Sequence, residues 1–486
     1  MKRILSLILS ICFLFCITAY AEEEYNYVEI INSVISFKSD DDAAIIIDDK
    51  LLENIGVNVY DWYAFCAGRL GKEDRFEEYL SGADEFVKNN DEINTIDYER
   101  LALVSAACGE DISDNGLLDK AVFEGFSSDN LSEKIVNHLI FALLVLDSDF
   151  YEIPNSANIT RNALITEILG RRLDSGAVYM MNKTTPETDL TAMMITAFFP
   201  YMNSSEEFLY TDINGIEQKT TVREAVEKGL NYLSSAQSEN GAMINWGKPS
   251  CETTAQTIVA LCTLGIDIET DERFIKNGNT LMDGLMSYKL ESGGFAHSFE
   301  GLGKADGYAS TQGMYAVISY LRSKNGYRNL FDMREEQDTD LYDNTKALEN
   351  AIDILDTSDV PQAEKILERY SQIPLTERMY IRNFSKLDDI LKINDIENTA
   401  DFTADDMKSS IRTNIHPTDI TAQRTLVSDE YIDEAGDNFS ALEISRAENT
   451  SNGKMSILQI VSVSLIGVLA LCVIIFNHTY LKRKRR

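Results

Sequence analysis

Four acidic residues stand at or just before the expected starts of apolar helices, and they are the first candidates for chemistry. They are Asp61, Asp189, Glu252 and Asp306. Hydrolysis of a glycosidic bond needs two carboxyl groups roughly 5–10 Å apart, one on each side of that bond. Acidic residues are also favoured at helix starts by capping and by the helix dipole. Both interpretations stay open, and Asp189, Glu252 and Asp306 are the candidate catalytic residues.

Aromatic and amide side chains occur at the same helix starts and in the loops before them. If these side chains converge on one cavity, they form a ligand site. The same side chains could instead form a plug that closes the structure. We predict the ligand-binding residues Trp62, Trp246, Gln256, Phe295, His297, Tyr308 and Gln312.

Metal-binding residues are sparse in this sequence. Zinc would need Cys, His and Asp ligands, and Cys251 with His297 could converge only from two different repeats. No metal is predicted, although zinc is not excluded. The four cysteines between the two ends of the chain are expected to be buried thiols; these are Cys66, Cys108, Cys251 and Cys262.

The candidate residues must be positioned by a repeated helical pattern over residues 24–330. Six segments rich in small and apolar residues end near residues 68, 109, 147, 200, 265 and 321. A spacing of roughly 40 to 65 residues fits one helical hairpin per repeat. Partner segments such as 222–236 and 278–289 carry apolar residues at helical spacing. The pattern predicts an all-α fold with a closed ring of six hairpins, whose inner helices begin at one rim.

Two motifs resemble a known superfamily. Residues 237–242 with Trp246 and Gly247, and residues 290–295, resemble the Q-x-x-x-G-x-W and GGF repeats of squalene cyclases and protein prenyltransferases. The chain is similar to bacterial surface proteins with prenyltransferase/squalene oxidase (terpenoid cyclase) repeats. This resemblance implies an (α/α)6 toroid. Extracellular cobalamin carriers have the same toroid, so a corrinoid ligand is not excluded. The cyclases carry their catalytic acid in a D-x-D-D motif. The only similar cluster in this sequence is at residues 40–42, before the first complete repeat.

The two ends of the chain predict export and membrane anchoring. A basic start, an apolar run and an Ala-x-Ala site indicate a signal peptide over residues 1–21. An uncharged apolar run over 456–476 is long enough to span a bilayer. The basic residues of 477–486 would stay in the cytoplasm. We therefore expect a single-pass cell-membrane protein with its N-terminal part outside. Between the ring and the span we expect a helical module at 340–396 and an acidic flexible stalk at 398–453.

The charge narrows the range of partners. The chain has 79 acidic and 44 basic residues and a formal net charge of −35. Such a charge argues against nucleic acid as a partner. The predicted function is therefore binding of a small molecule, a glycan or a protein surface at the rim of the ring. The alternatives are a glycan-active hydrolase or lyase that uses rim carboxylates, and a divergent terpenoid cyclase or prenyltransferase-like enzyme.

Overall fold

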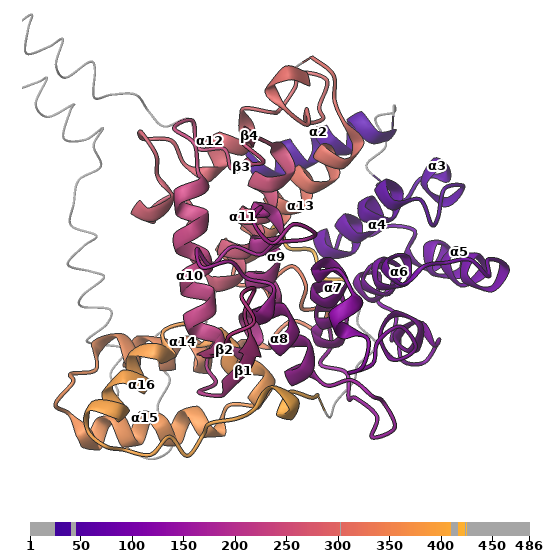
Figure 1. Ribbon diagram of the computed structural model, residues 1–486. Coiled ribbons are helices and arrows are strands. Elements are labelled where there is room, and N and C mark those ends of the chain that lie inside the picture. Colours follow the sequence, from indigo (N-terminus) through magenta and orange to yellow (C-terminus); the bar gives the residue numbers. More distant parts are fainter. Residues whose placement is uncertain (1–24, 40–44, 302, 410–416, 423, 425–486) are drawn as a thin grey trace, which may run out of the picture. The chain divides into compact units, whose positions relative to one another are not determined.

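The computed structural model describes residues 25–39, 45–301, 303–409, 417–422 and 424. These residues are mostly helical (Figure 1). The predicted signal peptide, the acidic residues 40–42, the span at 456–476 and the basic tail lie outside the described residues. Within the described part of the chain, no helix is both long and apolar enough to cross a membrane.

Six inner helices form a closed ring. Each of them contacts the next one along the chain, and the last contacts the first. Their ends agree closely with the six ends predicted from the sequence. The inner helices are α4 (Asn58–Leu70), α6 (Thr95–Ala107), α7 (Val136–Asp147), α9 (Thr188–Phe198), α11 (Cys251–Leu264) and α13 (Gly307–Lys324).

Shorter or more amphipathic elements alternate with the inner helices and cover them. The outer helices pack on one or both of the inner helices next to them, so each inner helix is buried on nearly all sides. The outer elements are α2 (Tyr27–Ser39), α3 (Asp49–Leu52), α5 (Phe76–Asn89), the π-helical turn η1 (Asp119–Phe123), α8 (Arg161–Gly170), α10 (Val222–Ala236) and α12 (Leu281–Met286).

Two small antiparallel hairpins depart from the all-α prediction. Strand β1 (Glu207–Thr211) pairs with β2 (Glu217–Thr221), and β3 (Ile244–Asn245) pairs with β4 (Lys248–Pro249). The second hairpin stands directly before α11, at the end of the ring where that helix begins. It therefore places its turn beside the starts of the inner helices.

Small residues allow the inner helices to pack closely. A Cβ atom added to Gly68 on α4 would lie 2.2 Å from the carbonyl oxygen of Ala107 on α6. No side chain fits at that distance, so the backbones of α4 and α6 can approach only because residue 68 is glycine. The ring of inner helices thus depends on the small residues that the sequence places at these positions.

The loop that follows α13 meets the C-terminal ends of inner helices. Arg69, in the last turn of α4, donates to the carbonyl oxygens of Asn329 and Asp332 at 3.0 and 2.8 Å. Arg322, in the last turn of α13, donates to the carbonyl oxygen of Arg69 at 2.8 Å. Cations at helix C-termini are favoured because the last carbonyl groups have no partner within the helix.

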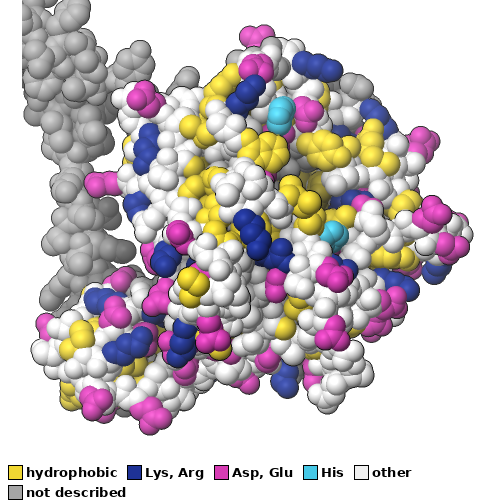
Figure 2. Space-filling model, viewed as in Figure 1, with side chains coloured by type: hydrophobic (Ala, Val, Ile, Leu, Met, Phe, Trp, Pro, Cys, Tyr) yellow, Lys and Arg dark blue, Asp and Glu magenta, His cyan; other side chains and the backbone are white. Residues whose placement is uncertain are grey.

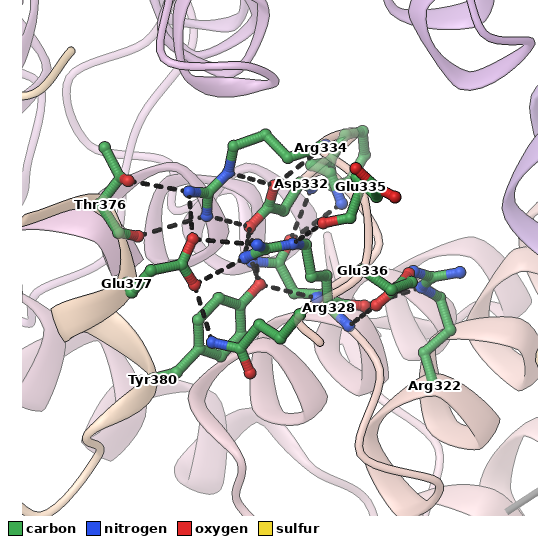
Figure 3. Close-up of polar contacts among 12 residues, drawn as sticks. Arg322, Arg328, Asp332, Arg334, Glu335, Glu336, Thr376, Glu377 and Tyr380 are labelled. Atoms are coloured by element: carbon green, nitrogen blue, oxygen red, sulfur yellow. Dashed lines mark hydrogen bonds and ion pairs between the residues drawn. The ribbon is translucent and has the colours of Figure 1, made fainter. Parts of the chain in front are cut away.

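A buried cluster of charges joins this loop to the helical module (Figure 3). Arg328 donates to both carboxylate oxygens of Glu377 at 2.9 Å, and Arg334 donates to Glu377 at 2.7 Å. Arg334 also donates to Asp332 at 2.6 and 2.8 Å, and the Tyr380 hydroxyl donates to Asp332 at 2.9 Å. Burial acts to raise the pKa of Asp332, but the charges of Arg334 and Arg328 outweigh it and hold that pKa well below its usual range. The pKa of Glu377 is lowered against burial in the same way.

Three helices form the predicted module at 340–396. They are α14 (Thr339–Ile354), α15 (Val360–Gln372) and α16 (Phe384–Ile393). Each contacts the other two. The 3-10 turn η6 (Leu375–Tyr380) lies between α15 and α16 and supplies Glu377 and Tyr380 to the charge cluster.

The beginning of the predicted stalk differs from the flexible segment expected from residue 398. Ser204 donates to the carbonyl oxygen of Phe402 at 2.5 Å, and the backbone N–H of Ser409 donates to Phe150 O at 2.9 Å. The N–H of Ile420 donates to Leu70 O at 3.2 Å, and Ile420 is fully buried. The described part of 398–424 is therefore packed against the ring. Residues 425–453 lie outside the described residues.

The charge cluster leads to a prediction about stability. In Glu377→Gln, the guanidinium groups of Arg328 and Arg334 would lose the carboxylate that they share. Removing one partner of a buried ion pair costs about 3–5 kcal/mol. Because the folded pKa values of Glu377 and Asp332 lie below the unfolded values near 4, the cluster stabilises the fold above about pH 4, and this contribution is lost as the pH falls further. Urea unfolding of the wild type and the variant at several pH values measures both effects.

The matched control is Glu335→Gln, because the Glu335 side chain is exposed next to the same cluster. The control should leave the free energy of unfolding near the wild-type value. Equal free energies of unfolding for the two variants would contradict a stabilising role of the cluster.

Candidate functional site

A cavity of about 320 Å³ lies among the N-terminal halves of the inner helices. Five of the seven predicted ligand-binding residues line it: Trp62, Trp246, Gln256, Tyr308 and Gln312. Phe331, from the loop after α13, also contributes to the lining. In the face shown in Figure 2, hydrophobic side chains gather over the middle of the ring, with charged side chains mostly around them. The structure thus brings together most of the aromatic and amide side chains that the sequence predicts.

Trp246 is held at the cavity by a strained turn. Strands β3 and β4 pair Asn245 with Lys248, so the turn between them contains only Trp246 and Gly247. Both turn residues have positive φ angles, 49° and 77°. Such two-residue turns favour Asn-Gly, and a bulky residue at positive φ is uncommon. The Trp246 side chain is 69% exposed, so its own burial does not offset the strain. Strain of this kind is found at ligand sites.

Trp62 and Tyr308 are two further aromatic side chains of the lining, whose apolar part also includes Phe141, Tyr315 and Phe331. Trp62 projects from α4 and contacts the rings of Phe141 and Tyr315, with centroid distances of 6.1 and 6.2 Å. Tyr308 lies in the first turn of α13 and is 48% exposed. The cavity therefore has one aromatic wall on α4 and two exposed aromatic side chains beside it.

The two predicted glutamines are in contact. Gln256 on α11 donates to the side-chain oxygen of Gln312 on α13 at 3.3 Å and also to the hydroxyl of Tyr315. The spacing from the helix starts places both amides in the cavity. This contact confirms that the two helices present these side chains to the same space.

Two carboxyl groups line the cavity from the start of α9. Asp189 was predicted, and its Oδ1 accepts from the N–H of Leu190 at 2.9 Å and from Asn245 at 3.1 Å. Glu187 was missed; it occupies the N-cap position of α9 but makes no capping hydrogen bond. Burial raises the pKa of Asp189. Burial and then the nearby charge of Asp189 raise the pKa of Glu187, and Trp246 and Asn245 partly oppose that rise.

Glu252 and His297 form a pair that does not line this cavity. Both carboxylate oxygens of Glu252 lie close to Nδ1 of His297, at 2.7 and 2.9 Å. This contact raises the pKa of His297, whereas burial raises the pKa of Glu252 and His297 opposes that rise. The sequence places both residues at the rim but does not indicate that they bind each other.

The side chains of the remaining predicted residues contribute to the fold and not to the cavity. Asp306 is the N-cap of α13 and accepts from the N–H of Ala309 at 3.0 Å. Asp61 is buried and accepts from Arg100 and Tyr79, each at 3.0 Å. Phe295 is fully buried. None of the three lines the cavity, since capping and burial occupy their side chains.

The four described cysteines are all buried, as predicted, and none of them forms a disulfide, which the sequence had left open. Burial raises the pKa of the Cys251 thiol well above its usual value, and Sγ lies 3.7 Å from the carbonyl oxygen of Ala309. A cysteine that binds zinc must be a thiolate, and the burial of Cys251 opposes the loss of its proton. Glu252 lies against Nδ1 of His297 and leaves Nε2 available to a metal, so it is Cys251 that does not fit a zinc site. Nor do the described residues contain a group of three or more His, Cys, Asp or Glu side chains that could hold a metal ion.

Comparisons with known proteins give limited results. No protein-family model matches the chain, and no curated protein matches it. Among solved structures, the chain is similar to an unsaturated glucuronyl hydrolase, responsible for the degradation of glycosaminoglycan, from Bacillus sp. GL1. The two share 12% identity with a TM-score of 0.32, over 64% of this chain and 90% of that chain. A likeness at this level says nothing of the substrate of this chain, and the resemblance to prenyltransferase/squalene oxidase repeats stays a prediction.

Proposed function

We propose that the cavity binds a carbohydrate, as a single sugar or as the end of a glycan. The observation that carries this proposal is the combination of Trp62, Trp246 and Tyr308 with carboxyl and amide groups in one cavity. A sugar ring has an apolar face of C–H groups and a polar edge of hydroxyls. Aromatic side chains pack against such a face, while carboxylates and amides accept or donate at the edge.

The size and the expected location of the cavity support the same proposal. About 320 Å³ lies at the lower end of the range for small-molecule sites, which suits one or two sugar units. The predicted signal peptide and the predicted span at 456–476 would place the cavity outside the cell. Glycans of cell walls, secretions and diet occur there. An isoprenoid-type activity has less support, because two carboxyls and several amides line the cavity.

Hydrolysis of a glycosidic bond is a second candidate, and one observation favours it. Glu187 and Asp189 line the same cavity, and burial raises the pKa of both carboxyls. A carboxyl group with a raised pKa can stay protonated and donate a proton to a leaving oxygen. A second carboxylate can then activate water or form the covalent intermediate. Asp189 would be the acid, because the N–H of Leu190 and the amide of Asn245 hold Oδ1 of its carboxyl in place.

The binding proposal predicts that Trp246→Ala weakens carbohydrate binding. Loss of the aromatic face should reduce affinity about tenfold or more, which is roughly 1.4 kcal/mol. The measurement begins with an array of immobilised oligosaccharides and continues with calorimetric titration of the best ligand into wild type and variant. Ile393→Ala is the control, because Ile393 is an exposed apolar residue on the helical module.

Either of two results would sink the proposal. The wild type could bind no sugar on the array, or Trp246→Ala could bind with the same affinity as the wild type and Ile393→Ala.

The hydrolysis candidate makes a separate prediction. Asp189→Asn should reduce the release of reducing ends from a bound oligosaccharide by about a hundredfold or more, because general acid catalysis contributes about 10²–10⁴. In the wild type the rate should fall as the pH rises through the raised pKa of Asp189, since the acid must carry its proton. Asp338→Asn is the control, because asparagine also serves as an N-cap at the start of α14. Binding without any release of reducing ends would leave this candidate without support.

A further inference from the structure

The cavity is unbalanced in charge. Among its lining residues are two carboxyl groups, Glu187 and Asp189, and a single cationic side chain, Arg100. Arg100 is already engaged by protein groups. Its Nε donates to Asp61 at 3.0 Å, Nη1 donates to Asp97 at 2.5 Å, and Nη2 donates to the carbonyl oxygen of Gly56 at 2.9 Å. The guanidinium therefore has no carboxylate of the cavity as its partner.

The groups that surround the two carboxyls are neutral or acidic. Burial is the largest cause of the raised pKa values of Tyr232 on α10 and Tyr315 on α13, and the negative charge of Asp189 raises both further. The charge of Glu252 on α11 also raises the pKa of Tyr315. The direct hydrogen-bond donors to Asp189 are Asn245 and the backbone of Leu190, which are uncharged. Two neighbouring carboxylates in such surroundings repel one another, and neither has a lysine or arginine as an ion-pair partner among the described residues.

The two carboxyl groups also set what a ligand must offer at this side of the cavity. An ionised carboxyl group only accepts hydrogen bonds. A ligand that meets Glu187 and Asp189 must therefore bring donors. An ammonium group carries three N–H donors and a positive charge.

The aromatic side chains suit the same kind of group. Trp62, Trp246 and Tyr308 border the cavity, and a cation over the face of a Trp or Tyr ring is attracted to it. An ammonium group near these rings would meet carboxylates on one side and aromatic faces on the other. A carboxylated sugar would instead add a third negative charge to a cavity with no free cation.

We infer that the carbohydrate bound in the cavity is an amino sugar with a free ammonium group, which Glu187 and Asp189 receive while its ring packs on the tryptophans. This inference rests on the proposed carbohydrate binding and names the substrate class. An N-acetylated or neutral sugar lacks the charge, and a uronic acid has the wrong charge.

The test compares four disaccharides by calorimetric titration into the purified chain. They are the β-1,4-linked dimers of glucosamine, of N-acetylglucosamine and of glucose, and a disaccharide that contains a uronic acid. The glucosamine dimer should bind at least tenfold more tightly than the glucose dimer, and the uronic acid disaccharide most weakly. This preference should shrink as salt is added. It should also shrink as the pH falls through the raised pKa values of the two carboxyls, because their protonation removes the negative charge.

The matched variant is Glu187→Gln with Asp189→Asn, which keeps the shape of both side chains. The preference for the glucosamine dimer over the glucose dimer should disappear. Circular dichroism of the variant shows that it is folded.

The outcomes separate the two proposals. If the glucose and glucosamine dimers bind equally, or the uronic acid disaccharide binds best, the amino-sugar inference is wrong and carbohydrate binding stands. If the double variant keeps the preference for glucosamine, the assignment to Glu187 and Asp189 is wrong. If no disaccharide binds, whether or not tetramethylammonium does, carbohydrate binding itself is wrong, and the inference falls with it.

Discussion

The same direction of all six inner helices is the constraint on which the rest of the structure depends. Their N-terminal halves line one cavity, and the C-terminal ends of several of them meet the loop after α13 or the segment after the helical module. Each helix leaves unpaired N–H groups and positive charge at its start, and unpaired carbonyl groups and negative charge at its end. Aligning six helices adds these effects at the two ends of the ring. The ends therefore require opposite side chains, and the sequence supplies them.

Arginines meet this requirement at the C-terminal ends. Arg161 donates to the carbonyl oxygens of Leu146 and Tyr151 at 3.0 and 2.9 Å, at the end of α7, and Arg322 does the same for α4. Each of these buried arginines also has a carboxylate partner, Asp147 for Arg161 and Glu336 for Arg322. Asp332 and Glu377 pair instead with Arg328 and Arg334 of the loop after α13, and because Glu377 belongs to η6, this second set of charges joins the helical module to the ring. The module is thereby part of the base of the ring.

The sequence predicted the six inner helices well, because small and apolar residues repeat along them at a nearly regular spacing. Five of the seven predicted aromatic, amide and histidine residues line the cavity. Phe295 and His297 do not, and Phe141, Tyr315 and Phe331, which do, were not predicted. The sequence could not separate Asp61 and Asp306 from Asp189, because all three are acidic residues near a helix start. Only contacts with distant residues such as Arg100 show that Asp61 is part of the core. Glu187 was missed since a residue before a helix reads as a cap, and its lack of a capping hydrogen bond appears only in the structure. The start of the predicted stalk is packed rather than flexible, because an acidic, polar composition does not reveal that Ala400, Phe402, Ala404, Met407 and Ile420 are buried.

At the mouth of the ring, where the inner helices begin and the cavity lies, the charges are paired less completely than at the base, where the helices end. Carboxyls at helix starts are favoured by the dipole, and capping occupies Asp306, whereas His297 lies against Glu252. In the described part of the chain Glu187 and Asp189 lack a cationic partner, and Trp246 is held exposed at a positive φ angle. The unpaired carboxyl groups and the strained turn cost free energy in the isolated chain, whereas the charges at the base of the ring are almost completely paired. Costs that persist at one end of a fold, next to a cavity, are best explained by a ligand that offsets them. The contrast between the two ends therefore locates function at the mouth independently of any single residue.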